Sequence, residues 1–114
     1  MHDLLRHLRK SGLFSSIKVL KLLEEEAVKL IKIKAEVDDG SVLYINEMHT
    51  KDYQKYSYHW QEKNGDLIIR WDNKSHWREL RTFPHHKHIG ERDNAVPSHR
   101  VTLEEVITEI KKRK

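Results

Sequence analysis

Residues 56–72 read YSYHWQEKNGDLIIRWD and contain the strongest hairpin signal in the chain. Asn64-Gly65 favours the type I′ turn that joins two twisted antiparallel strands. A two-residue loop pairs Lys63 with Asp66, and a four-residue loop would keep the same register between the two strands. The segment therefore predicts two antiparallel strands, at residues 56–61 and 66–72.

In this register, apolar and polar side chains separate onto opposite faces of the hairpin. The opposed apolar pairs are Trp60–Ile69 and Tyr58–Trp71. The opposed polar pairs are His59–Arg70 and Ser57–Asp72. A shift by one residue would mix the two faces, because successive side chains of a strand point in opposite directions. We therefore assign the face with the aromatic residues to the core.

Further strands are expected before the hairpin. Residues 27–37 alternate apolar and charged side chains, which is the period of a half-buried strand. The turn formers at 38–40 connect this segment to another strand at 41–48. Residues 14–23 fit a strand or a helix, and we favour a strand; a short strand is also allowed at 81–89.

Two helices complete the predicted fold. Residues 3–10 carry leucines on one side and end before Gly12. Near the C-terminus, Thr102 and Glu105 form a capping box in front of an apolar stripe. The expected fold class is α+β: an antiparallel meander sheet of about four to five strands with an N-terminal and a C-terminal helix.

Length and composition narrow the class of protein. The 114 residues fit one domain, which we assign to residues 1–114. The absence of cysteine excludes disulfides and thiolate chemistry. No apolar stretch approaches the roughly 20 residues of a membrane-spanning helix, so we expect a cytoplasmic protein without a membrane partner. Abundant Lys and Glu are compatible with a thermophile.

The polar face of the hairpin combines three residue types that suit phosphodiester cleavage. His59 lies opposite Arg70, and Asp72 lies two residues beyond Arg70 on the same face. A histidine that a carboxylate orients can act as general base or acid, and an arginine can hold a phosphate. A solvated polar cluster without catalytic function is the alternative.

A second group of histidines lies in the segment PHHKH at residues 84–88, with His76 upstream. In an extended segment His86 and His88 point to one side, while His85 and Lys87 point to the other. The imidazoles can supply acid and base to RNA cleavage, with Lys87 stabilising charge on the phosphate. They can equally bind a metal or belong to a histidine-rich loop without a catalytic function.

Aromatic and basic residues also alternate between positions 53 and 78, a pattern found in proteins that bind unpaired bases. Because Tyr58, Trp60 and Trp71 belong to the apolar hairpin face, we expect them in the core. Trp77 breaks no core pattern and is the better candidate for stacking on a base. The net charge of +4 does not demand binding to an extended duplex.

Three segments taken together resemble the TumE-like toxins of prokaryotic toxin–antitoxin pairs. They are YSYHWQEKNGDLIIRWDN at residues 56–73, SHWREL at 75–80 and TFPHHKH at 82–88. The resemblance extends over roughly residues 27–110 and implies a toxin that a cognate antitoxin protein neutralises. One departure lies at 75–78, which read SHWR where the family pattern has Pro-His-His-Pro. His76 keeps one of the two imidazoles, and Trp77 replaces the other.

The leading hypothesis from the sequence is a toxin that cleaves RNA without a metal or other cofactor. Its catalytic candidates are His59, Asp72, His85, His86 and His88, and its nucleic-acid-binding candidates are Arg70, Lys87, His76 and Trp77. The expected partners are a cognate antitoxin and RNA, with a homodimer left open. The alternatives are a metal-dependent hydrolase domain and a non-enzymatic module that inhibits a cellular target by binding.

Overall fold

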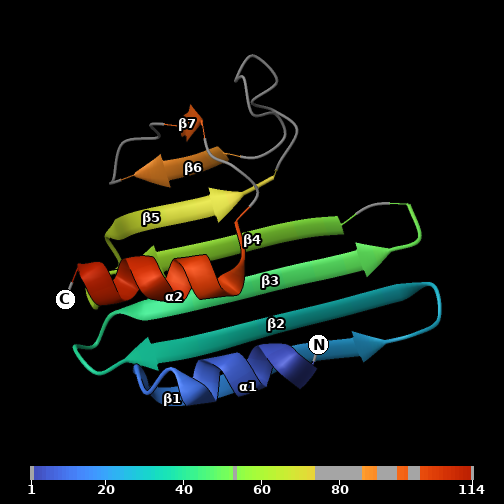
Figure 1. Ribbon diagram of the computed structural model, residues 1–114, viewed down its shortest axis with the longest axis horizontal. Helices are drawn as coiled ribbons and strands as arrows, with labels where there is room; N and C mark the ends of the chain where they lie inside the picture. Colours follow the sequence, from blue (N-terminus) through green and yellow to red (C-terminus); the bar gives the residue numbers. More distant parts are fainter. Residues whose placement is uncertain (1, 53, 74–85, 90–94, 98–100, 114) are drawn as a thin grey trace.

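The computed structural model describes residues 2–52, 54–73, 86–89, 95–97 and 101–113. These residues form one antiparallel sheet and two helices (Figure 1). The strands follow one another across the sheet in chain order, from β1 to β7. They are β1 Phe14–Glu24, β2 Val28–Val37, β3 Val42–Thr50, β4 Gln54–Gln61, β5 Leu67–Asp72, β6 His86–Ile89 and β7 Ala95–Pro97. Helix α1, His2–Lys10, precedes the sheet, and helix α2, Leu103–Lys112, follows it.

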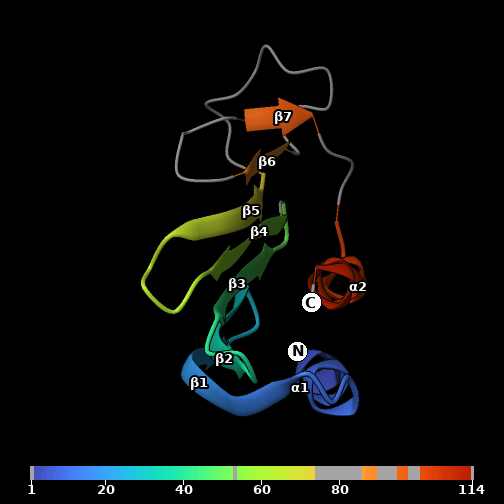
Figure 2. The same ribbon diagram turned by 90° about the vertical axis from the view of Figure 1, so that its left-hand side faces the viewer.

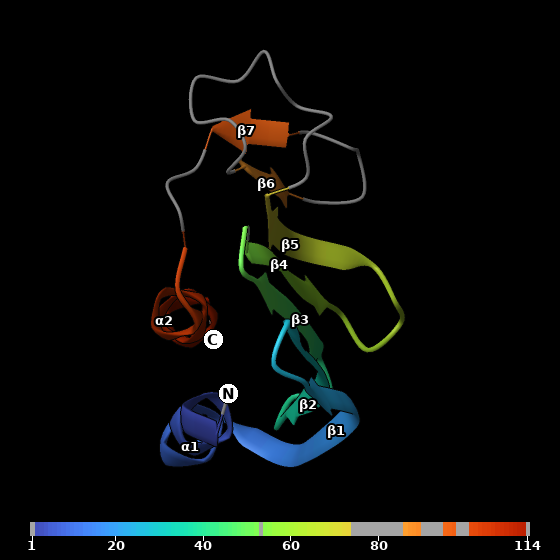
Figure 3. The same ribbon diagram turned by 90° about the vertical axis from the view of Figure 1, so that its right-hand side faces the viewer.

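Both helices lie on the same face of the sheet, as the two side views show (Figures 2 and 3). Helix α1 lies over the β1–β2 side and α2 over the middle strands (Figure 1). The N-cap of α2 is Thr102, whose side chain accepts a hydrogen bond from the Glu105 backbone N–H at 3.3 Å. This is one half of the predicted capping box, and it satisfies a backbone donor that has no partner inside the helix.

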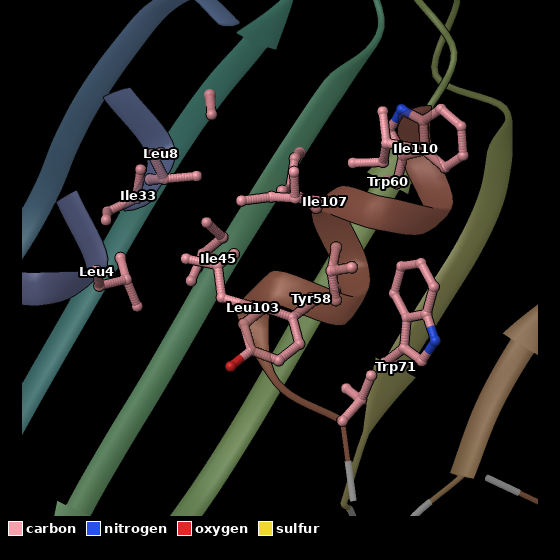
Figure 4. Packing of buried hydrophobic residues seen from close by; sticks show 14 of the residues in the cluster. Leu4, Leu8, Ile33, Ile45, Tyr58, Trp60, Trp71, Leu103, Ile107 and Ile110 are labelled. Carbon is pink, nitrogen blue, oxygen red and sulfur yellow. The ribbon is translucent and has the colours of Figure 1, made fainter. Parts of the chain in front are cut away.

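The core lies between the two helices and the face of the sheet that they cover (Figure 4). Helix α2 contributes Leu103, Val106, Ile107 and Ile110, and α1 contributes Leu4 and Leu8. Strands β2–β5 contribute alternate residues, which include Ile31, Ile33, Ile45, Tyr58, Trp60, Ile69 and Trp71. Phe14 and Ile17 of β1 are partly buried against this cluster. The predicted core position of the three hairpin aromatics is therefore confirmed.

The β4–β5 pairing follows the predicted register over four residue pairs, including His59 opposite Arg70 and Ser57 opposite Asp72. Nearer the turn the prediction was wrong. Among the described residues only glycines have a positive φ, so Asn64 does not adopt the conformation that type I′ requires. Instead Glu62 and Asp66 close a three-residue loop in which Gly65 has φ +98°, and the register shifts by one residue after Trp60.

The predicted α+β class, the antiparallel meander and the two flanking helices are confirmed. Five long strands, β1–β5, are followed by two short ones, and β7 had no counterpart in the prediction. The short strand allowed at 81–89 appears as β6, and residues 81–85 lie outside the described part. Within the described residues, no helix is long and apolar enough to cross a membrane.

Candidate functional site

Two rows of side chains cross the face of the sheet that α1 and α2 leave uncovered, which we call the open face. The strand registers define them, because directly opposed residues on neighbouring strands share a face. The His59 row contains Lys18, Lys34, Tyr44, His59 and Arg70, followed on β6 by backbone position 88. The Ser57 row contains Lys21, Lys32, Asn46, Ser57 and Asp72, followed on β6 by backbone position 86.

Arg70 joins the two rows. Its Nε atom donates a hydrogen bond to Asp72 Oδ2 at 3.0 Å, and its Nη1 atom lies 3.2 Å from His59 Nδ1. The Asp72 side chain is 1% exposed and that of Arg70 is 25% exposed. A buried carboxylate needs such a charged partner, since an unpaired charge in the interior is costly. The sequence prediction that His59, Arg70 and Asp72 share one face is borne out by this register and these contacts.

These contacts also determine where the proton of His59 lies. A guanidinium can only donate, so His59 Nδ1 accepts from Arg70 and the ring proton is on Nε2. Nε2 in turn donates to Gln61 Oε1 at 3.0 Å. His59 is therefore a neutral imidazole, with both ring nitrogens in hydrogen bonds.

The pKa of His59 lies below its ordinary value of 6.5. Burial of the ring is the main cause, because it disfavours the charged form. The hydrogen bond to Gln61 raises the pKa in part, and the positive charge of Arg70 lowers it further. A neutral imidazole near pH 7 is the form that can accept a proton.

A groove of about 620 Å³ opens on the same face, next to the Ser57 row. Lys32, Lys55 and Arg70 line it, and Glu47 also borders it. The strand register places Glu47 on the helix-covered face, opposite Ile31 and Tyr56. Ser57 also lines the groove, and its buried Oγ atom has no hydrogen-bond partner among the described residues. A groove with this excess of cations and an unsatisfied hydroxyl suits an anionic ligand that brings hydrogen-bonding oxygens.

The sequence profile of the family described as Toxin TumE matches residues 4–114. The chain belongs to the TumE toxin family. A TumE toxin acts as the toxin of a toxin–antitoxin pair, so a cognate antitoxin is its partner. Searches of curated proteins and of solved structures found no significant match to the chain.

The structure brings together only part of the site that the sequence predicts. Backbone pairing sets His88 opposite Arg70 and His86 opposite Asp72, so these two positions extend the rows that contain His59 and Ser57. Position 87 pairs with Trp71, which belongs to the helix-covered face. The predicted residues His76, Trp77 and His85 lie outside the described part of the chain.

Metal binding was an alternative in the sequence prediction. Among the residues whose side chains are described, no group of three or more His, Asp or Glu residues could hold an ion. The side chains of the β6 histidines do not belong to that set.

The sequence prediction did not include the four lysines at the start of the two rows or Tyr44 among the site residues. It placed Ser57 correctly opposite Asp72 but gave it no function. The alternation in residues 27–37 placed Lys32 and Lys34 on the polar side of their strand, which was a usable signal. The register of β1 was not readable, because the strand contains two irregularities, between Phe14 and Ser16 and between Val19 and Lys21.

Proposed function

We propose that this TumE toxin is a metal-independent ribonuclease whose active site lies on the open face. The observation that carries the proposal is the contact of Arg70 with both His59 and Asp72. It unites a neutral imidazole, a guanidinium and a buried carboxylate beside a cationic groove. The substrate is RNA, and the cognate antitoxin blocks the toxin. We further propose that the protein is cytoplasmic, comes from a thermophile and forms a homodimer.

The reaction that fits these groups is attack by the ribose 2′-hydroxyl on the adjacent phosphate. A general base removes the 2′-hydroxyl proton while the bond from O2′ to phosphorus forms. The bond from phosphorus to O5′ breaks, and a general acid protonates O5′. The products are a 2′,3′-cyclic phosphate and a 5′-hydroxyl, and no metal or oxidant is needed.

His59 is the general base in this scheme, because it is neutral and its pKa is lowered. His86 or His88, from the positions opposite Asp72 and Arg70, supplies the general acid. His85 stands as a further candidate for this acid–base chemistry. His76, Trp77 and Lys87 are candidates for contacts with the RNA.

Arg70 has two functions in the proposed mechanism. In the free protein Arg70 donates a hydrogen bond to His59 Nδ1, so this nitrogen is not available to accept a proton from the substrate. A substrate phosphate competes for the guanidinium with a bidentate, charge-assisted contact. Movement of Arg70 onto the phosphate then releases His59 Nδ1 for the 2′-hydroxyl proton, and Asp72 orients the guanidinium through its Nε contact.

Expression in cells without the antitoxin tests this function. The wild-type chain is expected to stop growth and to fragment cellular RNA, and co-expression of the antitoxin is expected to restore both. His59→Ala should abolish fragmentation, whereas His7→Ala, at an exposed position of α1, should not. Growth arrest by His59→Ala with intact RNA would instead favour a toxin that acts by binding.

A further inference from the structure

The β1–β2 side of the open face contains two pairs of directly opposed lysines. Lys18 pairs with Lys34, and Lys21 pairs with Lys32. Like charges at opposed positions of neighbouring strands destabilise a sheet. Two such destabilising pairs on the same two strands are explained if the protein binds a ligand whose negative charge neutralises the lysines.

Protection of the sheet edge accounts for only half of this arrangement. Lysines on an edge strand discourage pairing with other chains, and β1 is an edge strand. Lys32 and Lys34 lie on β2, which has neighbours on both sides. The same edge strand also exposes Val19, Leu20 and Leu22, so it is not strongly protected.

The lysine pairs are continuous with the candidate active site. The His59 row runs from Lys18 through Lys34 and Tyr44 to His59 and Arg70. Four strand spacings of about 4.8 Å give a path of roughly 19 Å from β1 to β5, enough for several nucleotides. The charges along this path are therefore placed to guide one ligand rather than to bind separate ions.

The charge balance of the open face differs from that of the whole chain. Its described strand positions contain the cations Lys18, Lys21, Lys32, Lys34, Lys55 and Arg70 and the carboxylates Glu36 and Asp72. The whole chain is nearly balanced, with 22 Lys and Arg against 18 Asp and Glu. Positive charge is thus concentrated on this face, as in proteins that bind a phosphate backbone.

Tyr44 indicates that the nucleic acid is single-stranded. Its ring is half-buried between the lysine pairs and His59, with a centroid distance of 6.2 Å to the His59 ring. An aromatic ring on a sheet surface is a platform on which an unpaired base can stack. A base-paired duplex offers no free base faces along its length to such a ring.

We propose that the lysines of β1 and β2 bind the phosphates of single-stranded RNA and lead the strand past Tyr44 to His59 and Arg70. This binding surface deepens the ribonuclease proposal and rests on it for the identity of the substrate. It adds substrate-binding residues on two strands that lie outside the His59–Arg70–Asp72 contact.

The test measures binding of a fluorescent single-stranded 2′-O-methyl RNA, which offers no 2′-hydroxyl for attack. The variant Lys32→Gln with Lys34→Gln is compared with the control Lys111→Gln with Lys112→Gln. Each changes the formal net charge by two units, from +4 to +2, and the control lysines lie on exposed positions of α2. Thermal unfolding of both variants verifies that they are folded.

We expect the Lys32/Lys34 variant to bind roughly tenfold more weakly than the control at low salt. Each lost phosphate contact lowers the slope of log affinity against log salt by about 0.7, so the slope should fall by about 1.4. If the Lys32/Lys34 variant does not fold, Lys18→Gln with Lys21→Gln, on the exposed edge, provides the same comparison. Equal affinity and slope in variant and control overturn the proposal.

Two further outcomes separate this surface from the catalytic proposal. Lysine-dependent binding of the probe together with intact natural RNA supports the surface and contradicts the ribonuclease. Normal RNA cleavage and normal binding by the lysine variant contradict the proposed RNA-binding surface and leave the ribonuclease proposal intact.

Loss of antitoxin binding by the lysine variant, with unchanged probe binding, also overturns the proposal. It would show that the lysine surface is an interface with the antitoxin.

Discussion

Arg70 holds the Nδ1 atom of His59 across the β4–β5 hairpin, with 3.2 Å between Nη1 and the ring nitrogen. The contact fixes the tautomer, and the charge of Arg70 lowers the pKa of His59 together with burial of the ring. The same guanidinium is bound to the buried carboxylate of Asp72. The tautomer and the pKa of His59 therefore depend on Arg70.

Arg70→Met is expected to raise the pKa of His59, because it removes a positive charge beside the ring. Titration of the His59 ring by NMR measures this directly. The wild-type midpoint should lie below 6.5, and the variant midpoint above that of the wild type. Arg9→Met, at an exposed position of α1, is the control and should leave the midpoint unchanged. An unchanged midpoint in Arg70→Met would show that Arg70 does not lower the pKa of His59.

The lowered pKa of His59 also predicts a pH dependence of stability. The unfolded chain binds a proton near pH 6.5, before the folded protein does, so acid favours unfolding. The stability is fully present above pH 6.5 and falls as the pH drops from there through the folded pKa. His59→Gln should therefore lose less stability than the wild type between about pH 7.5 and about pH 5. Urea unfolding at both pH values measures the free energy of unfolding of each protein. An equal loss in His59→Gln and in the wild type would contradict the lowered pKa of His59.

Ser41 and Ser57 are both buried, yet the same substitution should affect them differently. The Ser41 hydroxyl accepts from Trp60 Nε1 at 3.0 Å and donates to Asp39 Oδ1 at 2.6 Å. Ser41→Ala leaves the buried indole N–H unsatisfied and should cost about 1–3 kcal/mol.

Ser57→Ala is the matched control for that substitution, because the Ser57 hydroxyl has no partner among the described residues. Removing an unsatisfied buried hydroxyl should leave the free energy of unfolding unchanged or raise it. Chemical denaturation of both variants checks the pair. A Ser57→Ala cost as large as that of Ser41→Ala would mean that the Ser57 hydroxyl is satisfied in solution.

Lys32→Glu should stabilise the protein by about 0.2–1 kcal/mol, because it turns a like-charge pair with Lys21 into an opposite-charge pair. The same change should weaken RNA binding if the lysine surface is correct. A double-mutant cycle isolates the pair, since the gain should shrink in a Lys21→Gln background. An identical gain in both backgrounds would show that the two side chains do not interact.

The hairpin was the most predictable part of the fold, because the apolar and polar faces of residues 56–72 allow one register only. That register placed His59 opposite Arg70 correctly. The turn was predicted wrongly because Asn64-Gly65 fits two loop geometries, and local sequence does not decide between them.

The site was predictable only where its residues lie close together in the sequence. Asp72 and Arg70 share one strand, so their contact follows from strand alternation. The lysine rows depend on the pairing of β1 with β2, and two irregularities in β1 break the alternation from which a register is read. The RNA-binding roles of these lysines are proposals, as are the RNA-binding roles of Lys87, His76 and Trp77 and the catalytic role of His85.

The metal-independent ribonuclease proposal is best tested by incubating a single-stranded RNA with the purified chain in excess chelator. The wild type is expected to cut the RNA and to leave a 2′,3′-cyclic phosphate and a 5′-hydroxyl. His59→Ala should be slower by about 10²–10⁴-fold, the usual contribution of a general base or acid, and His7→Ala should match the wild type. No cleavage without metal would contradict the metal-independent mechanism. Equal rates for His59→Ala and the wild type would contradict the role of His59 as the general base.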